Sequence, residues 1–234
     1  MTAIQLDGVR RAFGRTLAVD RVDLIVSAGE IVGLIGHNGA GKSTCLGMIM
    51  GLVAPGEGHV RIAGHDVVTS PDAARAALGA VPEHPAVFDW LSAREFLTFV
   101  ADVRGGDPER ALAITGLGDD ADRLIREYSQ GMRRKVAIAA AMLGDPKALV
   151  LDEALNGLDP PSAVRVKAAL RAYADAGGAV LLSTHVVETV ASLADRVVML
   201  ARGRVVEDRA VEGLGPGELE RLFLERIGAT RDAI

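Results

Sequence analysis

The sequence predicts an α/β fold that has a core with a parallel sheet, an antiparallel β subdomain and a helical insertion. Three observations support this prediction. Apolar runs of strand length alternate with helices after residue 147, which is typical of a parallel sheet. Residues 1–67 combine alternating strand segments with one unit of strand, loop and helix. The part of the chain between these regions is dominated by helix signals.

The N-terminal part contains four expected strands and one helix. Strands are indicated by "AIQLDGV", "VDLIVSAGE" and "EIVGLIG", and a fourth strand with a turn by "GHVRIAGHDV" at 58–67. The third strand runs directly into a glycine-rich loop. The helix "STCLGMIMG" follows this loop and has Gly51 as its expected C-cap.

The middle and the end of the chain follow from cap and turn signals. Ser92 and Glu95 form a capping box for one helix of the insertion, and an Ala-rich helix is expected from Gly131 to Leu143. "KALVLD" and "AVLLSTH" are buried strands, and "RVVMLARGRVVED" predicts a hairpin. We expect one domain over residues 1–234, in which 1–82 and 147–234 form the core and β subdomain and 83–146 the helical subdomain.

Composition narrows the class of protein. The chain has 234 residues, and its net charge of −5 argues against a dedicated nucleic-acid binder, which usually carries a basic excess. The single cysteine, Cys45, excludes an internal disulfide and fits a reducing interior. There is no signal-peptide core and no apolar stretch of spanning length. We therefore expect a cytoplasmic protein, which leaves a membrane-bound partner open.

The glycine-rich loop "GHNGAGKS" has the spacing of a phosphate-binding loop, G-x-x-x-x-G-K-[ST]. Its glycines allow successive N–H groups to point at phosphate oxygens, Lys42 reaches the β- and γ-phosphates, and the Ser43 hydroxyl binds Mg²⁺. The alternative is a glycine-rich turn with an incidental lysine. Its position between a strand and a helix favours the phosphate site. The nucleotide-binding residues expected here are Gly36, His37, Asn38, Gly39, Ala40, Gly41, Lys42, Ser43 and Thr44.

Polar residues follow two of the buried strands. Asp152 and Glu153 end one strand, at the sheet edge where ligands bind in open α/β sheets. Asp152 is expected to hold Mg²⁺ through water, and Glu153, on the other face of an extended backbone, to polarise the attacking water. His185 ends another strand and could contact the γ-phosphate or orient that water. The alternative interpretations are acids that only terminate a strand and a structural histidine.

A second turn, in "EYSQGMRRK" at 127–135, also has the features of an anion site. Ser129 offers a hydroxyl at a helix N-cap, and Gly131 permits close backbone approach. The alternative is a capped helix start without a ligand. We expect the cations at 133–135 to form a solvated face rather than to bind a ligand.

These segments, in this order, resemble the nucleotide-binding subunit of ATP-binding cassette (ABC) transporters over almost the whole chain. "GHNGAGKST" is similar to the family's phosphate loop, "LVLDE" to its Walker B strand and "YSQGM" to its signature, usually written LSGGQ. "VPEHP" falls where the family joins the core to the helical insertion. "NGLDP" resembles the loop that crosses the dimer interface, and "STH" resembles the switch histidine. The resemblance implies a P-loop NTPase (RecA-like) core that binds ATP and Mg²⁺ and hydrolyses ATP.

The resemblance also implies partners and further site residues. In the family, two subunits enclose two ATP molecules head to tail, each between the phosphate loop of one subunit and the signature of the other. We therefore expect a second ATPase subunit, as a homodimer in the ATP-bound state. We also expect a membrane-spanning permease, which the pair powers from the cytoplasmic face of the plasma membrane. The remaining nucleotide contacts that the resemblance implies are Phe13, on adenine, and Ser129, Gln130, Gly131 and Asp159. The implied magnesium ligands are Ser43, Glu83 and Asp152.

The chain departs from the family pattern at several positions. Glu83 stands where most members have Gln, which places an additional negative charge near the γ-phosphate. Tyr128, Gln130 and Met132 replace signature residues, and Ala154 replaces the usual Pro after the catalytic Glu. A YSQGM-like signature together with this Glu resembles an exporter branch with drug, lipid, polysaccharide and antibiotic-resistance members. The segment "HPAVFDWLSAREF" is expected to offer an apolar groove to a permease helix; ordinary packing under the insertion is the alternative.

Two other functions compete with transport. A soluble ABC ATPase could act in repair, translation or cluster assembly, but this chain has one cassette and no sustained heptads. A nonhydrolytic ATP-binding regulator is disfavoured because Glu153 and His185 are both present.

Overall fold

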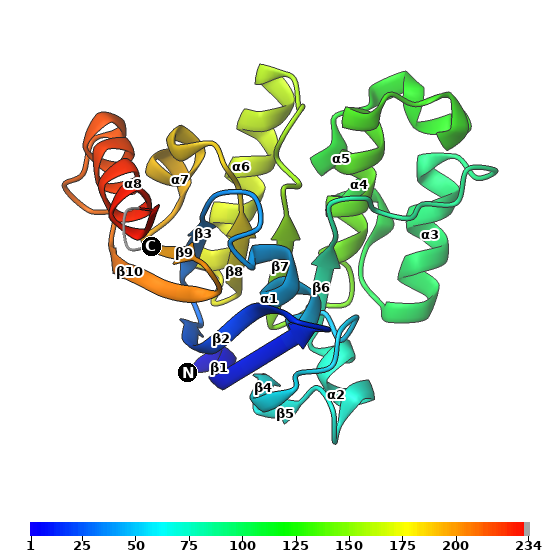
Figure 1. The fold of residues 1–234 in the computed structure, drawn as a ribbon. Coiled ribbons are helices and arrows are strands. Elements are labelled where there is room, and N and C mark those ends of the chain that lie inside the picture. The colour runs from blue at the N-terminus through cyan, green and yellow to red at the C-terminus, as the bar shows by residue number, and fades with distance from the viewer. Residues whose placement is uncertain (232–234) are drawn as a thin grey trace.

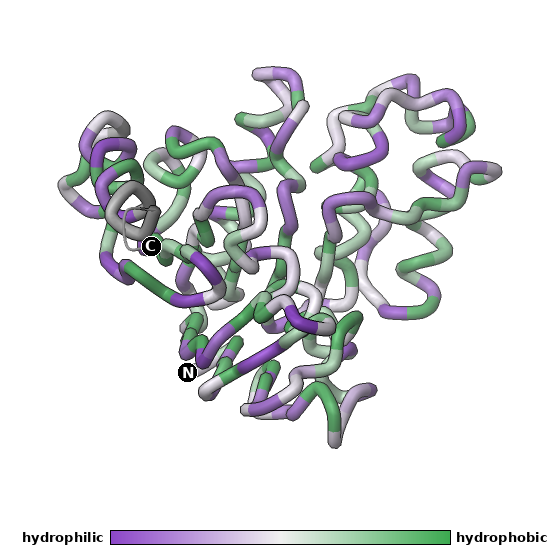
Figure 2. The backbone as a smooth tube through the Cα atoms, in the orientation of Figure 1, coloured by the Kyte–Doolittle hydropathy of each residue, from purple (hydrophilic) through white to green (hydrophobic). Residues whose placement is uncertain are grey.

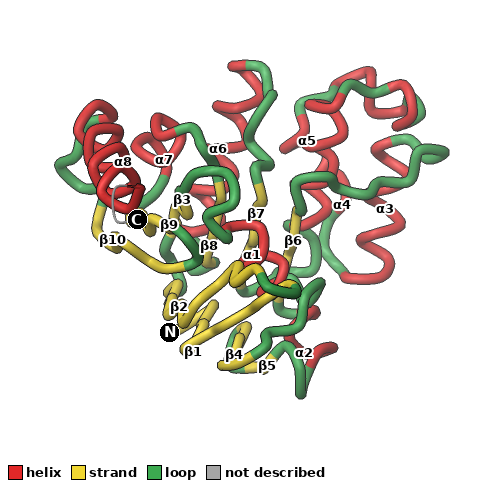
Figure 3. The backbone as a smooth tube through the Cα atoms, viewed as in Figure 1, coloured by secondary structure: helices red, strands yellow, loops and turns green. Residues whose placement is uncertain are grey.

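The computed structural model describes residues 1–231, which form a large sheet with helices on both faces and a smaller sheet packed against one of them (Figures 1 and 3). The strands are β1 (Thr2–Phe13), β2 (Thr16–Ser27), β3 (Ile31–Ile35), β4 (Glu57–Ile62), β5 (His65–Asp66), β6 (Leu78–Val81), β7 (Ala148–Asp152), β8 (Ala179–Ser183), β9 (Arg196–Ala201) and β10 (Arg204–Ala210). The helices are α1 (Lys42–Ile49), α2 (Pro71–Ala76), α3 (Ala93–Arg104), α4 (Pro108–Thr115), α5 (Gln130–Ala141), α6 (Pro160–Asp175), α7 (Val187–Leu193) and α8 (Pro216–Arg231), with the 3-10 helices η1 (Gly118–Asp122) and η2 (Ile125–Glu127).

The larger sheet has the strand order β10-β9-β3-β8-β7-β6, and its strands are parallel except for β10. Leu34 on β3 pairs with Ser183 on β8, and the same Ser183 pairs with Asp152 on β7. The three strands therefore end level at their carboxyl ends, which is the edge where open α/β sheets bind ligands. The predicted parallel sheet and the predicted hairpin of β9 and β10 are confirmed.

Both faces of the larger sheet are covered, which explains why its strands are continuous apolar runs. On β7, Ala148 and Val150 belong to the core that contains α1, α2 and the smaller sheet. Leu149 and Leu151 belong to the core on the opposite face, with α5, α6, α7 and α8. Because strand side chains alternate between faces, each short central strand contributes to both cores.

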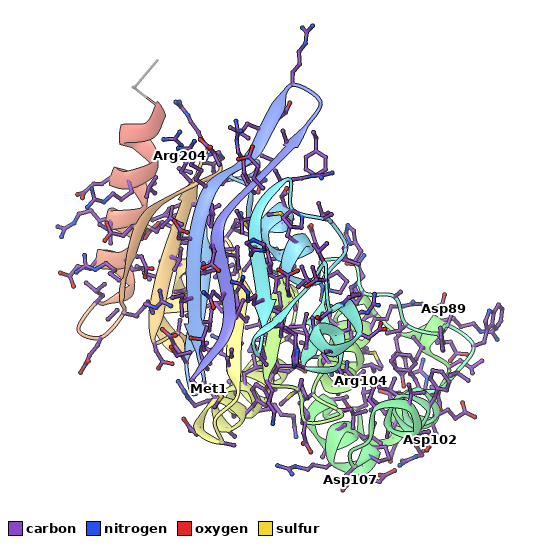
Figure 4. The ribbon with its side chains drawn as sticks, turned by 90° about the horizontal axis from the view of Figure 1, so that it is seen from below. Met1, Asp89, Asp102, Arg104, Asp107 and Arg204 are labelled. Carbon is purple, nitrogen blue, oxygen red and sulfur yellow. The ribbon has the colours of Figure 1, made fainter. Side chains whose placement is uncertain are left out.

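The smaller sheet is antiparallel, as predicted, with the order β2-β1-β4-β5. Its first two strands are each 12 residues long, and so longer than the short segments that the sequence indicates. Register shifts between Leu6 and Val9 let the pairing continue past irregular positions. Arg204 on β10 donates to Asp20 on β2 at 2.5 and 2.8 Å and joins the two sheets, on the side of the molecule away from the helical layer in Figure 4.

Helices α3, α4 and α5 form a layer beside β6 with a core of their own (Figure 1). The capping box of Ser92 and Glu95 at α3 is confirmed, and Asp107 caps α4. Figure 2 shows hydrophobic and hydrophilic residues alternating along these helices, as expected for a layer with one buried face. The layer lies within residues 83–146, although the exact subdomain boundaries stay predictions. No described helix is both long and apolar enough to cross a membrane.

Candidate nucleotide-binding and hydrolysis site

The phosphate loop leads from the end of β3 into α1 and requires glycine where other backbone segments come close. A Cβ added to Gly36 would lie 2.5 Å from the Leu200 carbonyl oxygen, and one added to Gly41 would lie 2.4 Å from that of Ala18. Gly41, the N-cap of α1, has a φ of 106°, and no side chain caps this helix. The N–H groups of the first turn are thus left open, as an anion site at a helix N-terminus requires.

The turn between β9 and β10 holds the phosphate loop from outside. The Gly203 N–H donates to the Ala40 carbonyl at 2.8 Å, and the Gly203 carbonyl accepts from the Asp20 N–H at 2.8 Å. A Cβ at Gly203 would lie 2.7 Å from the Ala18 carbonyl oxygen, so only glycine fits between the turn and β2. The loop is therefore fixed by contacts with two neighbouring elements.

Lys42 is buried within the curl of its own loop. Its ammonium group donates to the Gly36 carbonyl at 2.6 Å and to the His37 carbonyl at 3.4 Å. Burial lowers the pKa of Lys42, and the negative charges of Glu153, Asp152 and Glu83 act in the opposite direction. The predicted lysine and the three predicted carboxylates therefore interact across a single site.

The two acids after β7 are held by Ser183 on the neighbouring strand. The Ser183 hydroxyl donates to Asp152 Oδ1 at 2.5 Å and accepts from the Glu153 N–H at 3.0 Å. Glu153 has a φ of 50°, so the prediction that it continues an extended backbone is wrong. Its N–H also donates to the Ser183 carbonyl at 3.2 Å, and these bonds support a left-handed conformation that is otherwise unfavourable.

Glu153, His185 and Asn156 form one cluster of hydrogen-bonding side chains. His185 Nδ1 lies 3.1 Å from Glu153 Oε2, and the Asn156 amide donates to the same oxygen. The side chain of Glu153 is 14% exposed, whereas that of His185 is 64% exposed. The carboxylate is therefore held in place by two neighbours, and the imidazole can reach a ligand.

The second anion-binding turn lies at the start of α5, in the helical layer, and this layer stands apart from α1, which follows the phosphate loop (Figure 1). Ser129 caps α5 by accepting from the Met132 N–H at 3.2 Å. A Cβ added to Gly131 would lie 3.0 Å from the Gly157 carbonyl oxygen. The turn thus contacts the loop that follows Glu153.

The prediction that the cations at 133–135 form a solvated face is wrong for two of them. Arg134 is half-buried and donates to the Asn156 carbonyl, and Lys135 is buried and donates to the Ser162 hydroxyl at 3.2 Å. Helical periodicity alone does not reveal these contacts, because α5 packs against a segment more than 20 residues along the chain. Arg133 pairs instead with Asp89 at 2.5 Å.

Phe13 lies at the end of the β1–β2 hairpin, and its side chain is available for stacking. It is 47% exposed, and the Arg11 guanidinium lies 4.9 Å from the centre of its ring. Phe13 pairs with Thr16 across the hairpin, two residues before Ala18, whose carbonyl contacts Gly41. The aromatic side chain therefore lies on the hairpin that flanks the phosphate loop.

The oxygen ligands of the site suit Mg²⁺. Ser43 has an exposed hydroxyl in the first turn of α1, Asp152 has a buried carboxylate, and Glu83 has an exposed one after β6. Among the described residues, no group of three or more His, Cys, Asp and Glu is arranged to hold a metal ion. The hydroxyl and carboxylate oxygens of Ser43, Asp152 and Glu83 are of the kind that Mg²⁺ accepts, since this ion is commonly bound by one or two carboxylates together with the phosphates of the substrate.

Comparison with known proteins gives the family of the chain. Residues 19–156 match the family described as ABC transporter. The daunorubicin/doxorubicin resistance ATP-binding protein DrrA of Streptomyces peucetius is 39% identical, over 97% of this chain and 76% of DrrA. The chain belongs to the ABC transporter family. The bacitracin transport ATP-binding protein BcrA of Enterococcus faecalis is 32% identical, over 88% of this ABC chain and 68% of BcrA.

Solved ABC structures share nearly the whole fold. An ATP-binding subunit of an ABC transporter has a TM-score of 0.86 and 28% identity, and the match covers 94% of this chain and 99% of that subunit. The dimeric bacterial ABC transporter cassette MJ0796 has a TM-score of 0.78 and 25% identity, over 90% of this chain and all of the cassette (100%). The two sheets and the helical layer thus form the common ABC cassette, and the chain is an ABC ATPase.

Two residues that hold the acids after β7 are not among the site residues predicted from the sequence. Ser183 bonds both acids after β7, and Asn156 bonds Glu153. Both lie within motifs that the sequence shows, "STH" and "NGLDP", but their contacts depend on strand register and loop conformation. Asp159 caps α6, and the hydrogen bond from the Ser162 hydroxyl, at 2.7 Å, lowers its pKa. Its predicted contact with nucleotide stays a prediction.

Substitution of Gly41 tests the close approach at the phosphate loop. In Gly41→Ala the new methyl group meets the Ala18 carbonyl oxygen, so the loop must shift and its N–H groups lose their alignment. We expect the ATP dissociation constant to rise about tenfold or more, which is the scale of 1.4 kcal/mol. Calorimetric titration with ATP measures this change.

Gly39→Ala is the matched control, because Gly39 also has a positive φ, 80°, but no atom lies within 4 Å of an added Cβ. It should weaken ATP binding less than Gly41→Ala. An equal or larger loss in Gly39→Ala would mean that backbone conformation, and not close approach to β2, fixes the loop.

Proposed function

We propose that the chain is an ATP-hydrolysing subunit that powers export through a separate membrane permease. The observation that carries this proposal is the convergence of Lys42, Asp152 and Glu153 at one end of a parallel sheet. DrrA is named as a resistance protein and BcrA as a transport protein, and both are named as ATP-binding proteins. These names support export as the process that this ATPase drives.

Binding of ATP begins with the phosphates at the open N–H groups of the loop and α1. Lys42 then exchanges its bonds to the Gly36 and His37 carbonyls for the β- and γ-phosphates, which offer a charged acceptor. Burial of this ammonium group strengthens its attraction to the phosphates, because the local dielectric constant is low. Phe13, at the exposed end of the β1–β2 hairpin, provides a ring on which adenine stacks.

Hydrolysis requires a water molecule aligned with the γ-phosphate. Glu153 accepts a proton of this water, while the γ-phosphoryl group passes to the water oxygen and ADP leaves. If Nδ1 of His185 carries the proton of a neutral ring, its N–H donates a hydrogen bond to Glu153, and Nε2 can accept a hydrogen bond from the water. If both ring nitrogens are protonated, Nε2 donates to the γ-phosphate instead.

Mg²⁺ neutralises charge on the β- and γ-phosphates when it is bound. We assign its protein ligands as Ser43, Asp152 and Glu83, with Asp152 acting through water. Because the Ser183 hydroxyl donates to Asp152 Oδ1, the second carboxylate oxygen would be the one to accept a hydrogen bond from a magnesium-bound water. A carboxylate at Glu83 in place of an amide strengthens attraction to the metal but also repels the γ-phosphate.

The active form is proposed to be a homodimer, because the turn at the start of α5 has no phosphate loop of its own chain beside it. Ser129, Gln130, Gly131 and Asp159 would then face ATP bound to a second copy. The dimeric state of the MJ0796 cassette supports this arrangement. ATP would join the two subunits directly, so nucleotide binding and dimer closure become one event.

The permease is proposed to dock on the loop between β6 and α3. Trp90 is 73% exposed there and Phe88 is 54% exposed, with the ring centre of Phe99 on α3 5.6 Å from that of Phe88. Exposed aromatic side chains of this kind suit an amphipathic helix. Docking would place the chain on the cytoplasmic face of the plasma membrane.

No nucleic-acid partner is proposed, because the net charge of the chain is −5 and nucleic-acid binders usually carry a basic excess.

Glu153→Gln tests ATP hydrolysis. The amide cannot take a proton from water, so we expect turnover to fall about a hundredfold or more while ATP still binds. The ATP-bound dimer should accumulate, which gel filtration with and without ATP detects. Turnover near that of the wild type would remove Glu153 from the catalytic role, and wild-type protein without any ATPase activity would contradict the proposed function.

Glu83 is tested as a magnesium ligand by two substitutions. Glu83→Gln retains an oxygen that can bind a hard cation, so hydrolysis should keep its Mg²⁺ dependence. Glu83→Ala should raise the Mg²⁺ concentration needed for half-maximal turnover. If Glu83→Ala leaves the Mg²⁺ titration unchanged, Glu83 only connects β6 to the helical layer.

A further inference from the structure

Helix α5 is joined to the loop that follows Glu153 by a charged hydrogen bond. The Arg134 guanidinium donates from Nη1 to the Asn156 carbonyl oxygen. The same nitrogen lies 3.4 Å from the position that a Cβ on Gly157 would take, so the guanidinium packs directly on the loop backbone. Arg134 therefore anchors the carbonyl group of residue 156.

Asn156 in turn holds the carboxylate of Glu153. Its side-chain amide donates to Glu153 Oε2, and its N–H donates to the Glu153 carbonyl at 3.2 Å. The Thr184 hydroxyl donates to Asn156 Oδ1 at 3.4 Å, which directs the amide nitrogen toward Glu153. The side-chain oxygen and nitrogen of Asn156 are thus both hydrogen-bonded, and the nitrogen is directed at Glu153.

We propose that Arg134 and Asn156 are positioning residues that align Glu153 for hydrolysis. Arg134 acts from α5 of the same chain, and Asn156 acts from the loop that follows Glu153. This proposal rests on the proposed ATPase function. Arg134 is distinct from its neighbours on α5, because Arg133 pairs with Asp89 in the helical layer and Lys135 bonds Ser162 at the start of α6. Only Arg134 among these three bonds the residue that holds Glu153.

The physical argument concerns the geometry of the carboxylate. Glu153 follows β7 in a left-handed conformation, and beyond its backbone bonds to Ser183 the side chain is oriented by Asn156 and His185. Loss of the Arg134 bond removes the side-chain anchor on the Asn156 carbonyl, which lets the amide and the carboxylate shift together. A displacement near 1 Å in an active site lowers turnover by up to about a hundredfold. The substrate contacts of the phosphate loop remain, so ATP affinity is retained.

A double-mutant cycle on the full chain tests the proposal, with Arg134→Met, Asn156→Ala and their combination. Asn156→Ala keeps the carbonyl that Arg134 bonds but removes the amide that bonds Glu153. Each single variant should lower kcat about tenfold, with the KM for ATP changed less than about twofold, because only the transition state is affected. The double variant should have the kcat of Asn156→Ala, since Arg134 then has no amide left to position.

Two further variants complete the test. Arg134→Lys keeps one charged donor and should restore part of the kcat lost in Arg134→Met, which excludes a purely steric effect. Arg133→Met is the matched control on the same helix, and it should keep the wild-type kcat.

A double variant in which the two kcat losses multiply would overturn the proposal, because Arg134 would then act by another route. A rise in KM without a change in kcat would also overturn it and would assign Arg134 to nucleotide binding. ATP-dependent dimer formation, measured in the Glu153→Gln background, should survive Arg134→Met, and its loss would assign Arg134 to the signature contact instead. Wild-type turnover is measured first, so failure of the ATPase function itself is recognised separately.

Discussion

The level ending of β3, β8 and β7 is the constraint on which the catalytic site depends. Ser183 pairs with Leu34 on one side and Asp152 on the other, so the phosphate loop and both acids leave the sheet at the same height. The Ser183 hydroxyl then bonds the Asp152 carboxylate and the Glu153 N–H. A slip of one residue in any of the three strands would turn these side chains to the opposite face.

The same fold leaves the second anion-binding turn apart from the phosphate loop. Gly131 and Arg134 on α5 contact the loop at 156–157, and through Asn156 this loop contacts Glu153. Within one chain, the phosphate loop and the second anion-binding turn are therefore separate, and hydrogen bonds through Asn156 connect α5 to Glu153. In the proposed dimer, the start of α5 contacts the ATP bound by the partner subunit. Through Arg134, the same helix positions Glu153 beside the ATP bound by its own subunit.

Local chemistry decides which parts of this site can be predicted from the sequence. The phosphate loop at 36–44 and Asp152 are recognisable because each lies at a strand end with a fixed spacing of residue types. The conformation of Glu153 is not recognisable, because its left-handed backbone depends on bonds to Ser183 about 30 residues further along the chain. The prediction that Arg134 lies on a solvated face is wrong for the same reason, since its partner Asn156 follows β7, far from α5 along the chain. The fold itself was predictable because both cores require continuous apolar strands.

The most direct test of the account is complementation between a chain with Lys42→Ala and a chain with Ser129→Asp, which keeps a side-chain oxygen to cap α5. The first disables its own phosphate loop, and the second places a carboxylate against the γ-phosphate held by its partner, so each homodimer should be inactive. Random pairing makes about half of the dimers mixed, each with one of two sites intact, so ATPase activity should recover to about a quarter of wild type. Mixed dimers should also retain one tightly bound ATP. The absence of both recovered activity and retained ATP would contradict the claim that each site is completed by the partner's signature turn.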